Sequence, residues 1–143
     1  MIEKKEVIWI RMPYPTISDK LAKKRHMYIC LNRKNHDLML AKVQTDKVLN
    51  RIHMVEYIAE PDDPSRNPFR RDSLIDCDKR FELKDCEVSS EAYPKDARKD
   101  VCDSLFQEVV DKIKDKPINN IDVDIASSVD ERITRASASI SFT

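Results

Sequence analysis

Arg25 and Thr45 are the two residues whose types and positions suggest chemistry on a phosphate. Arg25 directly precedes one predicted strand and Thr45 ends the next, so a tight hairpin between those strands brings the two side chains together. A guanidinium holds a phosphate through two parallel hydrogen bonds, and a neighbouring hydroxyl can donate to a phosphoryl oxygen. Together they can stabilise the additional negative charge of a pentacoordinate phosphorane. The pair therefore predicts a site that acts on a phosphodiester.

RNA is the phosphodiester that needs the fewest further groups. Its own 2′-OH can serve as the nucleophile, so cleavage by internal attack requires positioning, charge stabilisation and proton transfer but no metal ion. His26 is a candidate for the proton transfer, because the intrinsic pKa of imidazole lies near neutrality, although in a regular strand it points away from Arg25. The widely spaced cysteines have no histidines beside them, so neither a metal nor another cofactor is expected.

Basic and aromatic residues around this pair form a candidate surface for binding RNA. Lysines in a loop can follow a phosphate backbone, and an aromatic ring can stack on a base. The candidates are Lys20, Lys23 and Lys24 in the loop before Arg25, Tyr14 beside that loop, and Arg70 in a second loop. Trp9 can also stack on a base, but a tryptophan within an apolar strand is expected in the core.

The uneven distribution of charge and the absence of glycine limit the classes of function that the chain can have. Residues 1–58 hold twelve Lys and Arg against six Asp and Glu, a net charge of +6, and the remaining 14 bases and 20 acids give −6. The asymmetry indicates an anionic partner for the first half. The chain contains no glycine, whereas average usage of about 7% predicts roughly ten. Glycine-rich loops that cradle nucleotide phosphates are therefore excluded.

The elements that must position these residues are mostly strands. Short β-branched and apolar runs predict strands at 7–12, 26–31, 38–45, 55–58 and 73–78. The second and third form a hairpin in which Asn35 can take the left-handed conformation that glycine usually fills. The three prolines within residues 61–68 indicate a loop. Five short strands with a curved hairpin favour a mainly β fold, a small barrel.

The second half adds a helix and a tail. Val101, Leu105, Val109 and Ile113 recur every four residues and predict an amphipathic helix over about 94–115. Residues 121–125 alternate as a half-buried strand does, and residues 137–142 alternate more weakly. The tail therefore either adds a strand or hairpin to a sheet edge or stays disordered until it meets a partner. The predicted organisation is a barrel domain with its C-terminal helix at 1–116 and an extension at 117–143.

The N-terminus and the apolar runs bear on location. The first residues contain no apolar signal segment, and no stretch approaches the roughly 18 apolar residues that a membrane-spanning helix needs. We therefore expect a cytoplasmic protein that does not cross a membrane. Its four cysteines are expected to be reduced and to serve as small buried apolar residues.

The order of these elements resembles the MazF/PemK-type toxin endoribonuclease family. The resemblance is carried by residues 6–13, 24–31, 38–45 and 72–78. It implies an SH3-like β-barrel that forms a homodimer, cleaves single-stranded RNA without a metal and is inhibited by an antitoxin protein. Arg25 matches the arginine with which the family stabilises the transition state, and Thr45 matches the hydroxyl residue beside it. The expected products are a 2′,3′-cyclic phosphate and a 5′-OH.

A second hypothesis is a non-catalytic SH3-like module that binds a protein or a nucleic acid. It is favoured by the absence of glycine and by His26, which stands where the family usually has proline. The two hypotheses differ in whether Arg25 and Thr45 act on a bond or only hold a ligand.

Overall fold

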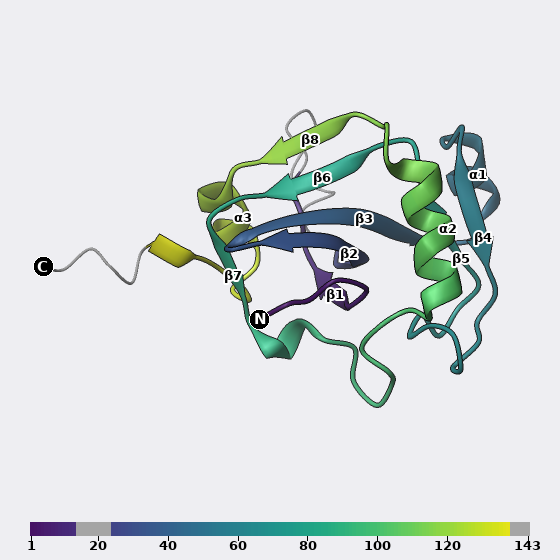
Figure 1. Ribbon diagram of the computed structural model, residues 1–143, viewed down its shortest axis with the longest axis horizontal. Coiled ribbons are helices and arrows are strands. Elements are labelled where there is room, and N and C mark those ends of the chain that lie inside the picture. Colours follow the sequence, from purple (N-terminus) through teal and green to yellow (C-terminus); the bar gives the residue numbers. More distant parts are fainter. Residues whose placement is uncertain (14–23, 138–143) are drawn as a thin grey trace, which may run out of the picture.

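The computed structural model describes residues 1–13 and 24–137 and shows a mainly β protein with three α-helices (Figure 1). The elements in chain order are β1 (Val7–Ile10), β2 (His26–Lys34), β3 (Asp37–Thr45), α1 (Val48–Ile52), β4 (Tyr57–Glu60), β5 (Ser73–Asp76), β6 (Arg80–Leu83), β7 (Cys86–Val88), the 3₁₀ turn η1 (Ser90–Ala92), α2 (Asp103–Ile113), β8 (Ile118–Ile121), α3 (Val123–Val129) and β9 (Ile133–Arg135).

Strand β3 organises a mostly antiparallel sheet. One edge of β3 pairs with β2. On its other edge, residues 38–40 pair with β6 and residues 43–45 pair with β5. β1 extends the sheet beyond β2, β4 extends it beyond β5, and β8 joins β6 in parallel; β7 and β9 form a separate pair. Because β3 changes partner halfway along, the sheet divides into two branches.

The β2–β3 hairpin matches its sequence prediction closely. Asn35 has φ of 57°, so the expected left-handed turn residue is confirmed. The register shifts between Cys30 and Asn32, where β2 holds one residue more than its partner strand. Such a bulge bends the strand that carries it and increases the local twist.

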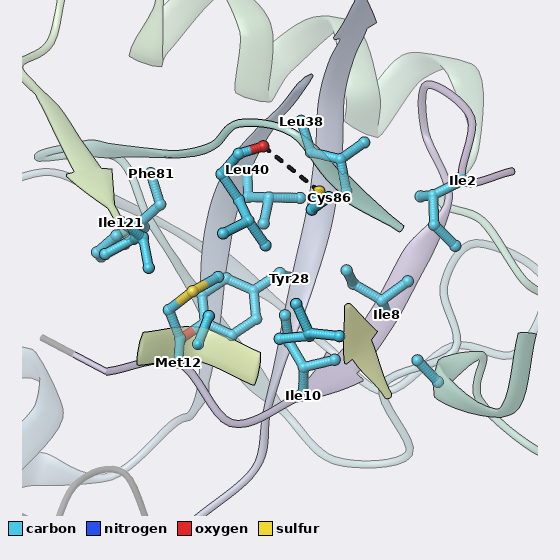
Figure 2. Packing of buried hydrophobic residues seen from close by; sticks show 14 of the residues in the cluster. Ile2, Ile8, Ile10, Met12, Tyr28, Leu38, Leu40, Phe81, Cys86 and Ile121 are labelled. Atoms are coloured by element: carbon cyan, nitrogen blue, oxygen red, sulfur yellow. Dashed lines mark hydrogen bonds between the residues drawn. The ribbon is translucent and has the colours of Figure 1, made fainter. Parts of the chain in front are cut away.

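Alternate residues of the hairpin belong to two apolar clusters, one on each face of the sheet. Tyr28 and Leu40 belong to the first cluster, in which the Tyr28 and Phe81 rings meet edge to face at 6.0 Å (Figure 2). Ile29 and Val43 belong to the second, which α2 covers. The strand period of two thus gives the hairpin two buried faces, and the strands can be apolar along their whole length.

The helix predicted over 94–115 is shorter in the structure, running from Asp103 to Ile113. The residues before it bind β1 instead: Val7 N donates to Lys99 O at 2.7 Å, and Val101 N donates to Lys5 O at 3.1 Å. Pro94 therefore lies outside the helix, because the chain that follows it, at Lys99 and Val101, forms backbone hydrogen bonds with residues 5 and 7 at the start of β1. The predicted apolar stripe is confirmed, with Leu105, Phe106, Val109 and Ile113 buried.

The strand predicted at 121–125 is wrong in most of its length. β8 ends at Ile121, and α3 begins two residues later. The Asp122 carboxylate accepts a hydrogen bond from Asp124 N at 2.8 Å, and this N-cap starts the helix. Four residues of this part of the chain lie in the first apolar cluster, namely Ile121, Val123, Ala126 and Ile133. Of the predicted segment 137–142, all but Ser137 lies outside the described residues.

Several other boundaries differ from the prediction, and three strands are new. β1 stops at Ile10, β4 begins at Tyr57 and β5 ends at Asp76, whereas β6, β7 and β9 lie where no strand was predicted. Three cysteines are buried and Cys102 is partly exposed, all four with free thiols. Within the described ranges, every helix is too short or too polar to cross a membrane.

Candidate anion-binding site

A cavity of about 490 Å³ opens where β2 begins and β3 ends. Its wall combines segments that are far apart in the sequence: β1, the hairpin ends, the loop before β5, the segment after η1 and the turn before β9. The residues that line it are Trp9, Arg25, His26, Met27, Val43, Gln44, Thr45, Phe69, Arg70, Arg71, Ser73, Glu91, Tyr93, Pro94, Lys95 and Arg132. We call this space the basic cavity.

Arg25 and Thr45 lie at the open end of the β2–β3 hairpin. The last pair of that ladder is Met27 with Val43, and Arg25 and Thr45 each lie two residues beyond it. Side chains two residues apart along a strand project from the same face, which places Thr45 on the face of Val43. Both line the basic cavity, and no described residue accepts a hydrogen bond from the Thr45 hydroxyl. The structure thus brings together the two residues that the sequence singled out.

The lining of the basic cavity is strongly positive. Five of the lining residues are cationic, and only Glu91 is anionic. Arg70, Arg71, Lys95 and Arg132 form no ion pair with a carboxylate among the described residues. Cations gathered in a concave, partly apolar site concentrate the field and attract anions. The sequence indicated the loop of Arg70 and Arg71, but Lys95 and Arg132 join the site only through the tertiary structure.

The loop that presents Arg70 is held by a buried polar network. Asn67 Nδ2 donates to Glu60 Oε2 at 2.8 Å and to Pro61 O at 3.0 Å. Its side-chain oxygen accepts from Phe69 N at 3.0 Å. Asn67 is 1% exposed and Glu60 5%. The network fixes the chain just before Arg70, whose backbone takes a left-handed φ of 64°; sequence analysis did not detect this support.

Arg25 is held by two acidic residues of the turn that follows α3. Its Nη2 lies 3.1 Å from Glu131 Oε1, and its Nε lies 3.7 Å from Asp130 Oδ2. The Nε–H is buried and makes no hydrogen bond with a described residue. The Glu131 side chain is 74% exposed, and an ion pair with so exposed a partner contributes little, about 0–1 kcal/mol. A phosphate can therefore compete with Glu131 for this guanidinium.

Asp130 has a structural role beside Arg25. Its buried carboxylate accepts hydrogen bonds from Arg11 N at 2.8 Å and from Arg132 N at 3.0 Å. These bonds anchor the turn after α3 to the end of β1. The turn then places Arg132 in the wall of the basic cavity and Glu131 beside Arg25.

Trp9 lies on the surface, so its predicted place in the core is wrong. The side chain is 44% exposed, whereas Ile8 and Ile10 on either side are fully buried. The guanidinium carbons of Arg25 and Arg132 lie 5.7 and 5.8 Å from the ring centre. Side chains alternate along β1, so Ile8 and Ile10 point into the first apolar cluster. Trp9 lies on the opposite face, paired with Met27 near the hairpin end that carries Arg25.

His26 is a base rather than an acid at neutral pH. Burial, and after it the charges of Lys42 and Lys24, lower the pKa of its imidazole to about 4. The residue borders the cavity but pairs with Ile10 in the ladder, on the strand face opposite to that of Arg25. The neutral ring can accept a proton but cannot supply one to a leaving group at pH 7.

We expect the buried imidazole to make the fold sensitive to acid. In the unfolded chain a histidine binds its proton near pH 6.5, whereas in the folded protein His26 does so only near pH 4. Stability supplied by the neutral ring is therefore present above pH 6.5 and is lost as the pH falls toward 4, by an amount on the order of 3 kcal/mol. Urea unfolding of His26→Gln between pH 7 and pH 4 should show a shallower loss than the wild type. Parallel slopes would contradict the assigned burial.

Three of the remaining predicted binding residues, Tyr14, Lys20 and Lys23, lie outside the described residues. Lys24 is described and exposed but does not line the basic cavity. Among residues 1–13 and 24–137, no group of three or more His, Cys, Asp or Glu side chains is placed to hold a metal ion.

Fold and site together define a mainly β protein with a basic cavity that also exposes an aromatic ring. No protein-family model matches the sequence, and comparison with curated proteins finds no match. The resemblance to MazF/PemK-type toxins therefore rests on the four short segments and on the order of the first elements.

Proposed function

We propose that the protein is an endoribonuclease that cleaves single-stranded RNA by attack of the 2′-OH on the adjacent phosphate, with no metal ion. The observation that supports this most directly is that Arg25 and Thr45, at the open end of the β2–β3 hairpin, both line a cavity with four further cations. A guanidinium and a hydroxyl on one strand face can both donate to the same phosphoryl group. The resemblance to MazF/PemK-type toxins supports the same pair.

The proposed reaction is a transesterification. The 2′-oxygen forms a bond to phosphorus while the bond from phosphorus to O5′ breaks, which leaves a 2′,3′-cyclic phosphate and a 5′-OH. Arg25 and Thr45 donate to the non-bridging oxygens, where negative charge increases in the transition state. The Glu131 carboxylate, beside Arg25, can accept the 2′-OH proton, and solvent supplies a proton to O5′.

The SH3-like barrel belongs to the same proposal. Three features support it: the bulge in β2, the division of β3 between two partner strands, and the apolar clusters on both faces of the hairpin. Each bends or covers a sheet that would otherwise lie flat with one open face.

The assay that tests the activity is incubation of the purified protein with single-stranded RNA in EDTA. We expect fragments ending in a 2′,3′-cyclic phosphate and a 5′-OH. An RNA with a single 2′-deoxy residue at the cut position should stay intact there, because its nucleophile has been removed. Cleavage of that deoxy position, or no cleavage of any RNA, would overturn the proposal.

A non-catalytic binding module is the second candidate, and one observation favours it. Arg25 is already paired with Glu131 and lies near Asp130. A site whose central guanidinium is neutralised in this way can bind and release a nucleic acid without acting on it. Tight binding of RNA that stays intact over hours would favour this candidate over the nuclease.

A protein partner is proposed on separate grounds. The homodimer and the antitoxin are predictions of the family resemblance. Four apolar side chains in and just after α1 are largely exposed, namely Val48, Leu49, Ile52 and Val55. A patch of this kind on a small protein is typical of a surface that binds another protein.

We expect expression without a partner to arrest bacterial growth, and Thr45→Ala to relieve the arrest.

A further inference from the structure

We propose that Trp9 forms a nucleobase subsite of the basic cavity, on which a base next to the bound phosphate stacks. The inference rests on the proposed function in one respect, namely that a single-stranded nucleic acid is the ligand of the cavity. It adds a contact to the base, whereas Arg25 and Thr45 contact only the phosphate.

The position of Trp9 is the first support. Trp9 pairs with Met27 in the β1–β2 ladder, so Arg25, two residues before Met27, is its diagonal neighbour on the same face. Across the three neighbouring strands the residues are therefore Trp9 in β1, Arg25 just before β2 and Thr45 at the end of β3, and all three line the cavity. A nucleotide whose phosphate lies between Arg25 and Thr45 has its neighbouring base within reach of the ring.

The exposure of Trp9 is the second support. A large aromatic side chain that is 44% exposed leaves apolar surface in water, although the residues beside it in the strand are buried. The cavity volume of about 490 Å³ falls within the range of about 300–1,000 Å³ typical of small-ligand sites. Tyr93, the tyrosine in the wall, is less suitable, because its hydroxyl donates to Glu6 at 2.7 Å and Lys99 lies 4.9 Å from its ring centre.

The charge around Trp9 points to a nucleic acid rather than to an apolar peptide. Arg25 and Arg132 both lie against the ring, and Arg132 Nη1 donates to Trp9 O at 3.0 Å. Single-stranded nucleic acid binding combines cations that follow the backbone with aromatic rings that stack on bases. The ring and both guanidiniums belong to the same cavity, so phosphate and base can be held at once.

The experiment uses Trp9 as its own probe, since it is the only tryptophan in the chain. The ligand is a random-sequence RNA dodecamer with every 2′-OH replaced by fluorine, which has no nucleophile and cannot be cleaved internally. An abasic phosphodiester of the same length and charge is the matched control. We expect the RNA to quench Trp9 fluorescence and to bind about 5- to 150-fold more tightly than the abasic strand.

The variant Trp9→Leu should bind the RNA and the abasic strand with similar affinity, measured by anisotropy of labelled strands, and Trp9→Phe should retain part of the preference. Circular dichroism confirms that each variant is folded. Equal binding of both strands to the wild type, with no quenching, would overturn the subsite but not the phosphate site. A Trp9→Leu variant that binds RNA normally but loses a dimer would place Trp9 in a protein interface and overturn it too. Base-dependent binding without cleavage of ordinary RNA would uphold the subsite and overturn the nuclease.

Discussion

Arg25→Ala should lower the rate of RNA cleavage about 100- to 1,000-fold, the loss typical of removing one donor to an oxyanion. The effect should fall mainly on kcat, because four other cations line the cavity and can still attract the RNA. Arg25→Lys should recover only part of the rate, since an ammonium keeps the charge but not the planar fork that holds two oxygens. Single-turnover cleavage in EDTA measures both.

Two comparisons separate the chemistry of Arg25 from its structural contacts. Removing Arg25 leaves Asp130 buried without its cationic neighbour, so the melting temperature of each variant must be measured beside its rate. Arg33→Ala is the matched control: Arg33 pairs with Glu3 and does not line the basic cavity. Arg33→Ala should keep the wild-type rate. A folded Arg25→Ala protein that cleaves as fast as wild type would remove Arg25 from the mechanism.

Asn67→Ala should destabilise the fold by about 2–4 kcal/mol. The change removes three hydrogen bonds and leaves the buried carboxylate of Glu60 with one donor fewer. The backbone N–H of Phe69 and the carbonyl of Pro61 also lose their partner. Urea unfolding at neutral pH gives the free-energy difference directly.

The same variant should also weaken the site, because the network holds the loop that presents Arg70 and Arg71. We expect the affinity for single-stranded RNA to fall under conditions in which the protein is still folded. Asn120→Ala is the control, since Asn120 is exposed in β8 and its loss should change stability by less than about 0.5 kcal/mol. Equal stabilities of the two variants would show that Asn67 is not structural.

Local patterns in the sequence were sufficient for the hairpin. A strand's period of two, a polar turn and Asn35 indicate its two strands and its turn. The bulge between Cys30 and Asn32, which the sequence did not reveal, shifts the pairing by one residue on the side of the hairpin that carries Arg25 and Thr45. The apolar stripe of α2 was also predictable, since its period is a property of consecutive residues.

Other predictions failed where a distant segment decided the outcome. The residues after Pro94 have a helical pattern, yet Lys99 and Val101 bond to the start of β1, which no local signal reveals. Residues 121–125 alternate like a strand, but the cap supplied by Asp122 starts a helix that packs into the first apolar cluster. Trp9 is similar: its strand is apolar throughout, and only the packing of β1 decides which side chains face inward.

The sequence by itself determined the mainly β class, the β2–β3 hairpin and the choice of Arg25 and Thr45, which both line the cavity. Only the tertiary structure showed that Lys95 and Arg132 join them, that Asn67 supports the loop beside them and that Glu131 lies against Arg25. The physical reason is the range of the interactions. Hairpin register and helix period arise between near neighbours, whereas the cavity wall is assembled from segments more than 100 residues apart, whose proximity depends on how the whole core packs.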